Sequence, residues 1–247
     1  MPLDARAPAL RGQRTMTQRW VDITFLHWAV EPERVAPLLP RGVRPDVLDG
    51  VTHVGLIPFR MVDAGVGSGP AVPYLGTFLE TNVRFYSTDD EGRHGVVFGS
   101  LEASRLLVSV AARAVFGTPY TWASMSTSRS GDRVTYTSRR RWPGPRGART
   151  SLTVDIGPEV PEPSPLDHFV TARYGLHTTI LGRPWWVPNE HPPWPLRRAT
   201  LVDLDDELLA AACFPDLAAR PPDSVLHSTG TRTAFGMPQR LAGPAAR

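Results

Sequence analysis

The sequence predicts a mainly β protein with flanking helices, and three observations favour this fold class. Several short stretches alternate polar and apolar residues, as half-buried strands do. Turn-forming runs such as Ser130-Gly131-Asp132 separate neighbouring stretches, which is typical of antiparallel hairpins. Strands do not alternate regularly with long helices, and this argues against a parallel α/β sheet.

The clearest strand pattern lies between Tyr74 and Tyr86. Glu80, Asn82 and Arg84 fall at alternate positions, and the positions between them are apolar or threonine. Successive side chains of a strand point to opposite faces, so one face is polar and the other apolar. An acid, an amide and a guanidinium on one face can orient a small carboxylate or carbonyl compound. The alternative is that this face meets water, as one side of an antiparallel sheet often does.

Further strands and helices follow in order along the chain. Pro58 makes its strand an edge strand or a bulge. Ser104 is the candidate N-cap of the clearest helix, which ends before Gly117, and Ser164 with Asp167 begins the next helix. The strands are expected over residues 20–28, 51–61, 78–86, 95–100, 120–127, 133–142, 151–156, 176–180, 185–187, 196–202 and 225–228. Helices are expected over residues 32–39, 104–116, 164–174 and 205–213.

The chain is interpreted as one domain between two loose ends. Residues 1–16 are rich in Arg, Ala and Pro and are expected to form a disordered arm, residues 17–236 the domain, and residues 237–247 a loose tail. No stretch is apolar enough for a membrane span, and the first residues lack the core of a signal peptide. We therefore expect a cytoplasmic protein without a membrane partner; homo-oligomerisation stays open.

Composition excludes several kinds of chemistry. All 27 basic side chains are arginine, so no lysine of this chain can form a Schiff base. The single cysteine, Cys213, excludes an intramolecular disulfide and a cysteine-rich metal cluster. The seven histidines show no metal-ligand spacing, and neither a phosphate-binding loop nor a serine nucleophile elbow occurs. We expect no cofactor and no metal.

A cluster of arginines is the main basic feature. Arg139, Arg140 and Arg141 are consecutive, and Arg146 and Arg149 follow them. A solvated loop edge explains this cluster more simply than a phosphate-binding surface, because the net charge is only +3. Association with nucleic acid is thus the weakest of the functional hypotheses.

Three further residues have both a structural and a functional interpretation. Glu102 precedes the clearest helix; its carboxylate is expected to cap the backbone N–H groups there, and the alternative is a catalytic role. Arg113 lies near the end of that helix, where a cation is favourable against the helix dipole, but it could also bind a ligand. Tyr120 follows Pro119 at the start of a strand, where an aromatic residue most often packs.

Several blocks of the sequence together resemble a known family. The runs H-W at 27–28, F-L-E-T-N-V-R-F-Y, V-F-G-S-L-E-A, A-A-R-A-V-F-G-T-P-Y, L-D-H-F-V-T-A-R-Y and H-P-P-W-P-L occur in this order over roughly residues 18–230. They are similar to the bacterial YqjF-like domain of unknown function, in the acetoacetate decarboxylase-like superfamily. The resemblance implies a closed, conical antiparallel β-barrel with helices packed outside and a ligand cavity inside.

The resemblance also bears on Tyr120. In the decarboxylases of that superfamily an arginine on a helix is followed by Gly-x-Pro-Lys, and the lysine forms the Schiff base. Here Arg113 is similar to that arginine, Gly117 and Pro119 match, and Tyr120 stands at the lysine position. A phenol can donate a hydrogen bond or a proton but cannot form an imine, so acetoacetate decarboxylation by the family mechanism is excluded.

These observations lead to one main hypothesis and two alternatives. The main hypothesis is a cavity for a small organic acid or carbonyl compound, in which Arg84, Asn82 and Arg113 bind the ligand. Tyr120 would polarise or protonate a carbonyl, and Glu80 would act as base or orient Arg84, in a lyase, hydratase or isomerase step. The first alternative is a non-catalytic binding protein with the same cavity, and the second is the nucleic-acid-associated protein.

Overall fold

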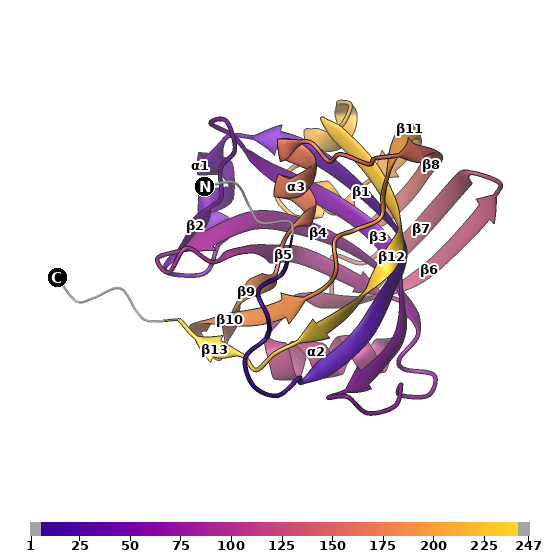
Figure 1. Ribbon diagram of the computed structural model, residues 1–247. Helices are drawn as coiled ribbons and strands as arrows, with labels where there is room; N and C mark the ends of the chain where they lie inside the picture. Colours follow the sequence, from indigo (N-terminus) through magenta and orange to yellow (C-terminus); the bar gives the residue numbers. More distant parts are fainter. Residues whose placement is uncertain (1–5, 242–247) are drawn as a thin grey trace.

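The computed structural model describes residues 6–241, except for the side chains at positions 111, 112 and 114–116 (Figure 1). The predicted class is confirmed, because strands dominate these residues and helices are few and short. The strands are β1 (Met16–Val30), β2 (Val43–Pro45), β3 (Thr52–Val66), β4 (Phe78–Asp89), β5 (His94–Ala103), β6 (Tyr120–Ser130), β7 (Arg133–Trp142), β8 (Arg149–Glu159), β9 (Gly175–Ile180), β10 (Arg183–Glu190), β11 (Leu196–Asp206), β12 (Ser224–Phe235) and β13 (Gln239–Arg240). The helices are α1 (Pro32–Val35), α2 (Leu106–Phe116), α3 (Pro165–Thr171) and α4 (Leu208–Ala211), with 3₁₀ turns η1 (Ala36–Leu38) and η2 (Leu217–Ala219).

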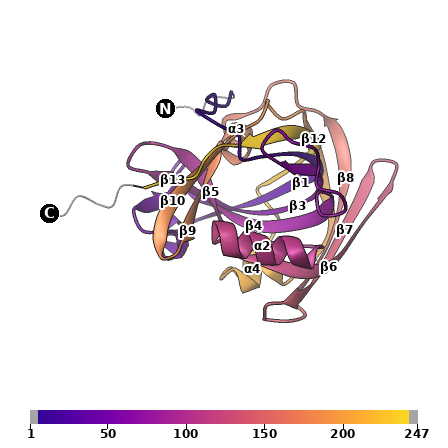
Figure 2. The same ribbon diagram turned by 90° about the horizontal axis from the view of Figure 1, so that it is seen from below.

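The strands are hydrogen-bonded into two rings that share a wall. The order β5-β6-β7-β8-β11-β12-β1-β3-β4 returns to its start through the β4–β5 pairing. The pairings of β9 with β5 and of β10 with β12 complete a second ring, which runs β5-β9-β10-β12-β1-β3-β4. Most neighbours are antiparallel, and the pairings of β5 with β6 and with β9 are parallel. Figure 2 shows α2 lying across one end of the strands.

Each ring encloses its own apolar core, so strands of the shared wall are buried on both faces. On β4, Val83 and Phe85 belong to the core of the first ring, whereas Phe78 and Tyr86 belong to that of the second. Residues of α4 and η2 pack into the first core, and Phe169 and Val170 of α3 pack into the second. The polar row predicted on this strand therefore faces the interior of the second ring.

Local sequence signals explain several element boundaries. Ser164 accepts a hydrogen bond from the Asp167 N–H and Asp167 returns one, which is the predicted capping box of α3. α2 ends at Gly117, whose φ of 63° suits glycine. Pro58 lies where the β1–β3 register is interrupted, as expected for a residue without an N–H.

Other boundary predictions were wrong. Ser104 does not cap α2; its hydroxyl accepts the Leu79 N–H, and Arg105 occupies the N-cap position. The helix predicted to continue to Gly175 ends at Thr171, because Gly175 begins β9 and pairs with β10. β1 begins at Met16, before the predicted start, because its first residues pair with β12.

The described parts of the two chain ends lie against the sheet. In the predicted arm, the Leu10 N–H and the Arg14 guanidinium both contact the Glu190 carboxylate. In the predicted tail, β13 pairs with β10. Residues 1–5 and 242–247 of these predicted segments lie outside the described residues. The longest helix in the described part of the chain has 11 residues, too few for any of these helices to span a bilayer.

Candidate functional site

A cavity of about 500 Å³ lies inside the second ring. Its volume is within the usual range for small-molecule sites, and its wall is largely apolar with a few polar groups. The polar and aromatic side chains that line it are Thr15, Gln18, Trp20, Phe59, Phe78, Glu80, Asn82, Arg84, Phe98, Thr118, Tyr120, Thr171, Arg173, Asn189, His191, Trp194 and Phe235.

The polar row of β4 lines this cavity. Glu80 and Asn82 are only 3% and 4% exposed, and Arg84 is half-buried. The alternative that this face meets bulk water is therefore wrong, because β9, β10 and α3 cover it. Buried polar groups need partners, so the contacts of these three residues define what the cavity can hold.

Glu80 and Tyr120 form a hydrogen-bonded pair. The Tyr120 hydroxyl donates to Glu80 Oε2 across 2.8 Å. Burial raises the pKa of Glu80 to about 7, although hydrogen bonds from Tyr120 and Asn82 lower it. Burial and the neighbouring Glu80 hold the pKa of Tyr120 well above its ordinary value. The pair therefore combines a carboxyl that titrates near neutral pH with a phenol that keeps its proton.

Arg84 is a cation without an acidic partner. Its Nε donates to the Tyr86 hydroxyl at 3.0 Å and its Nη2 donates to the Val170 carbonyl at 2.7 Å. Its guanidinium also lies 5.5 Å from the centre of the Phe25 ring. Within residues 6–241 it forms no ion pair, so a positive charge remains uncompensated at the cavity wall.

Arg173 is a second cavity arginine, which no local pattern in the sequence indicated. It is 4% exposed and forms an ion pair with Asp46, and its Nε donates to the Phe169 carbonyl at 2.7 Å. Asp46 also contacts His94 Nδ1 at 2.7 Å, so Asp46 is held from two sides. Arg173 Nη2 is buried and has no hydrogen-bond partner among the described atoms.

Aromatic side chains from β1 and from the segment before β11 form another part of the cavity wall. The Trp20 and Trp194 rings are stacked, with centroids 5.7 Å apart and planes 8° from parallel. The His191 ring lies 5.0 Å from Trp194, and burial lowers its pKa, so the imidazole is neutral at pH 7. These planar surfaces suit a flat ligand group.

Four buried polar atoms that belong to cavity-lining residues have no partner in the described part of the chain. They are Trp20 Nε1, Asn82 Oδ1, Arg173 Nη2 and Asn189 Oδ1. An unpaired buried polar group costs about 1–3 kcal/mol, so such atoms are rarely left unsatisfied. At the cavity wall, these four atoms are available to form hydrogen bonds with polar groups that enter the cavity.

The structure brings together four of the five residues predicted for the site. Glu80, Asn82, Arg84 and Tyr120 line one cavity, but Arg113 does not. The exposed Arg113 side chain turns back to the Tyr120 carbonyl, to which its Nη1 donates at 3.0 Å, and lies 6.0 Å from the Trp142 ring. We therefore leave Arg113 out of the proposed site.

Glu102 does not cap α2, so that expectation was wrong. It is fully buried and paired with Arg140, whose guanidinium also donates to the Ser100 hydroxyl at 2.9 Å. Because Arg140 is buried and paired, it adds no exposed charge to the predicted basic cluster. This pairing joins β5 to β7 and is structural.

A Ser–His–Asp chain occurs that the sequence did not suggest. The Ser87 hydroxyl lies 2.8 Å from His177 Nδ1, and His177 Nε2 lies 3.1 Å from Asp89 Oδ2. All three are at most 2% exposed, the Trp186 ring covers His177 at 4.7 Å, and Arg93 pairs with Asp89 at 2.7 Å. A substrate has no access to this serine, so we assign the chain a structural role. No group of three or more metal-ligating side chains gathers within the described residues.

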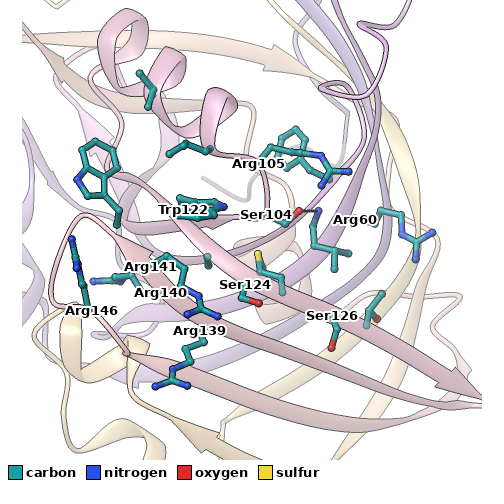
Figure 3. Close-up of a pocket in the computed structure, with 18 of the residues that line it drawn as sticks. Arg60, Ser104, Arg105, Trp122, Ser124, Ser126, Arg139, Arg140, Arg141 and Arg146 are labelled. Atoms are coloured by element: carbon teal, nitrogen blue, oxygen red, sulfur yellow. Dashed lines mark hydrogen bonds between the residues drawn. The ribbon is translucent and has the colours of Figure 1, made fainter.

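A wide groove of about 1360 Å³ lies outside this cavity, along β6 and β7 (Figure 3). No acidic side chain is among the residues lining it, and Figure 3 shows arginines from several elements around Trp122. They are Arg60, Arg105, Arg139, Arg140, Arg141 and Arg146. The predicted cluster thus contributes Arg139 and Arg141 to an exposed basic surface of β7.

The sequence matches one family over most of its length. Residues 17–232 match the model of DUF2071, which is described as an uncharacterized conserved protein. The chain is also 30% identical over 184 residues to the uncharacterized protein YqjF of Bacillus subtilis (strain 168), and this region covers 74% of the chain and 76% of YqjF.

Solved structures share the fold at low sequence identity. Acetoacetate decarboxylase from Legionella pneumophila has a TM-score of 0.65 at 15% identity, covering 97% of this chain and 94% of that one. An acetoacetate decarboxylase-like enzyme from Sphingomonas wittichii RW1 has a TM-score of 0.64 at 13% identity, with 94% and 95% coverage. The enduracididine biosynthesis enzyme MppR, complexed with pyruvate, has a TM-score of 0.62 at 15% identity, with 95% and 93% coverage.

Proposed function

Because this chain belongs to the DUF2071 family and has an acetoacetate decarboxylase-like fold, we propose that its cavity binds an organic acid that also carries a carbonyl group. Arg84 and Arg173 hold the carboxylate, and Glu80 with Tyr120 transfers a proton at the carbonyl end. No covalent bond forms between ligand and protein. The natural reaction classes are isomerase, hydratase and lyase.

The observation that carries this proposal is the uncompensated charge of Arg84. A half-buried guanidinium beside a largely apolar cavity is stabilised by an anion, and Arg173 offers an unpaired Nη2 on the same cavity. Asp46 neutralises Arg173 but not Arg84, so the part of the wall that holds the two arginines keeps one positive charge, which a monocarboxylate would balance there.

The Glu80–Tyr120 pair supports an acid–base step. In its ionised form Glu80 takes a proton from the carbon next to the ligand carbonyl, and the C–H electron pair becomes a carbon–carbon double bond. The carbonyl π electrons move to oxygen. As Glu80 becomes protonated, the Tyr120 hydroxyl gives up its hydrogen bond to that carboxylate and donates to the developing enolate instead. A pKa of about 7 matches Glu80 to this task at neutral pH.

Two further observations support the ligand class. MppR, which shares this fold, is complexed with pyruvate, a small oxo acid. The resemblance places Tyr120 at the position of the decarboxylase lysine. The chain contains no lysine at all, so any step on an oxo acid proceeds without an imine to a lysine.

Thermal unfolding with a panel of oxo acids and aromatic carboxylates tests the binding step. A ligand at a hundred times its dissociation constant stabilises a protein by about 2.7 kcal/mol, so the midpoint should rise by several degrees. The rise should be lost in Arg84→Gln and kept in Arg60→Gln, which changes an exposed arginine outside the cavity. Because Arg84→Gln also removes structural hydrogen bonds, uncharged amides of the same acids serve as a second control on wild type. Equal shifts from acids and amides, or no shift with any acid, would overturn the proposal.

A further inference from the structure

We propose, resting on the function proposed above, that the ligand is a ring-containing acid whose carboxylate and carbonyl lie on opposite sides of the ring. Pyruvate and other short oxo acids are then poor ligands of this chain. Four observations carry this inference: the length of the polar row, the position of both cations, the course of the aromatic wall and the size of the cavity.

The polar row separates the two ends of the ligand. Glu80 and Arg84 are four residues apart on a continuous strand, so their Cα atoms lie about 13 Å apart at about 3.3 Å per residue. The Arg84 guanidinium also extends away from Glu80, since it donates to the Tyr86 hydroxyl, two residues further along β4. A two- or three-carbon acid cannot contact both ends.

Arg173 lies at the Arg84 end. Its guanidinium is 4.9 Å from the centre of the Tyr86 ring, and that of Arg84 is 5.4 Å from the same ring. The two cations thus meet at one tyrosine, and the Glu80–Tyr120 pair lies at the other end of the row. This arrangement separates the anion-binding end from the proton-transfer end.

The aromatic wall joins these two ends. At the proton-transfer end, Phe59 pairs with Glu80 across β3 and β4. Its ring packs edge-on against that of Trp20, with ring centroids 6.1 Å apart. At the anion-binding end, the Phe25 ring lies under the Arg84 guanidinium. It packs edge-on against the Trp194 ring, with ring centroids 5.3 Å apart.

Trp20 and Trp194, stacked on each other, therefore lie between the two polar ends. A planar ring of the ligand packs well against such a wall. Asn82 is the middle residue of the polar row, and its unpaired Oδ1, with Trp20 Nε1, offers polar contacts near the ring.

The volume agrees with an elongated ligand. A cavity of about 500 Å³ is of the size that encloses a drug-sized molecule, and a short oxo acid would leave most of its apolar wall uncovered. Since apolar wall area buried by a ligand contributes to affinity, the ring should supply much of the binding free energy.

Titration calorimetry with a graded set of acids tests this inference. Pyruvate, 4-oxopentanoate and 4-acetylbenzoate separate carboxylate and carbonyl by increasing lengths, and only the last contains a ring between them. We expect 4-acetylbenzoate to bind wild type at least tenfold more tightly than the two short acids. It should also bind at least tenfold more tightly than benzoate, which lacks the carbonyl, and than acetophenone, which lacks the carboxylate.

Two variants test which end of the cavity binds the carbonyl group of the ligand and which binds its carboxylate. Tyr120→Phe should lower the affinity for 4-acetylbenzoate toward that for benzoate and leave the affinity for benzoate unchanged. Arg84→Gln should lower the affinity for 4-acetylbenzoate toward that for acetophenone. Tighter binding of pyruvate or 4-oxopentanoate than of 4-acetylbenzoate would overturn the ring class and leave the proposed function standing. Absence of binding by every acid would overturn both. The ligand series on wild type decides the matter even where a variant fails to fold.

Discussion

The Tyr120 hydroxyl donates to Glu80 Oε2 at 2.8 Å inside a largely apolar cavity, and this contact joins β6 to β4. The two residues are 40 positions apart in the sequence. Burial favours the neutral form of both groups, so the phenol keeps its proton and the carboxyl gains or loses its own near neutral pH. Arg84, which forms no ion pair within residues 6–241, leaves a positive charge at the wall of the same cavity.

Glu80 makes the stability of the protein depend on pH. Its pKa is about 7 in the folded state against an ordinary value of 4.5, so folding disfavours its ionised form. The resulting penalty is absent below about pH 4.5, grows as the pH rises and is complete above about pH 7; it amounts to about 3 kcal/mol. Glu80→Gln should therefore gain about that much stability relative to wild type between pH 4.5 and pH 8, measured by urea unfolding. A difference that does not change with pH would contradict this assignment.

Tyr120→Phe should alter the pH dependence of proton transfer. The phenol hydrogen bond lowers the pKa of Glu80, so its removal should move the pKa of the base upward. The rate of proton exchange should fall about 100-fold or more, because the enolate loses its donor. The measurement is the pH–rate profile of exchange, with far-UV circular dichroism as a control for folding. A lower rate with an unmoved profile would show that Tyr120 does not contact the base.

Arg140 and its neighbour Arg139 should differ sharply in their effect on stability. Arg140 is buried against Glu102, so Arg140→Ala leaves an unpaired buried carboxylate and should cost about 3–5 kcal/mol. Arg139 is exposed on the same strand, and Arg139→Ala should change stability by less than about 0.5 kcal/mol. Chemical denaturation of both variants checks this, and equal costs would contradict the buried pairing.

Gly117 should not tolerate a side chain. Its φ is 63°, and a Cβ atom there would lie 2.1 Å from the Thr179 carbonyl oxygen. Gly131 has nearly the same φ, 61°, with open space around it. Gly131→Ala should therefore lower the free energy of unfolding only by the strain of a positive φ, about 1–2 kcal/mol. Gly117→Ala should cost clearly more in thermal unfolding, because β9 must also move. A similar cost for both would mean that α2 does not pack on β9 there.

The strands and part of the site follow from local patterns in the sequence. The alternation of Glu80, Asn82 and Arg84 predicted the polar face, and Gly117 and Ser164 marked the end of one helix and the start of another. These signals act over a few residues, so they can be detected without knowledge of the fold.

The missed features depend on contacts between distant segments. Asp46 and Arg173 are 127 residues apart, and nothing in either neighbourhood indicates the ion pair that holds Arg173 at the cavity. Glu102 was assigned to a helix cap because its partner Arg140, 38 residues away, lies on another strand. The Trp20–Trp194 stack likewise forms only when β1 and the segment before β11 meet.

The most direct test of the central claim is proton exchange on a bound ligand. The methyl protons of 4-acetylbenzoate lie next to its carbonyl, and their replacement by deuterium in D₂O can be followed by NMR. We predict that wild type accelerates this exchange, that the rate follows ionisation of a group with a pKa of about 7, and that Glu80→Gln abolishes it while still binding the acid. Binding without accelerated exchange in wild type would contradict the acid–base role of Glu80 and leave a non-catalytic binding protein.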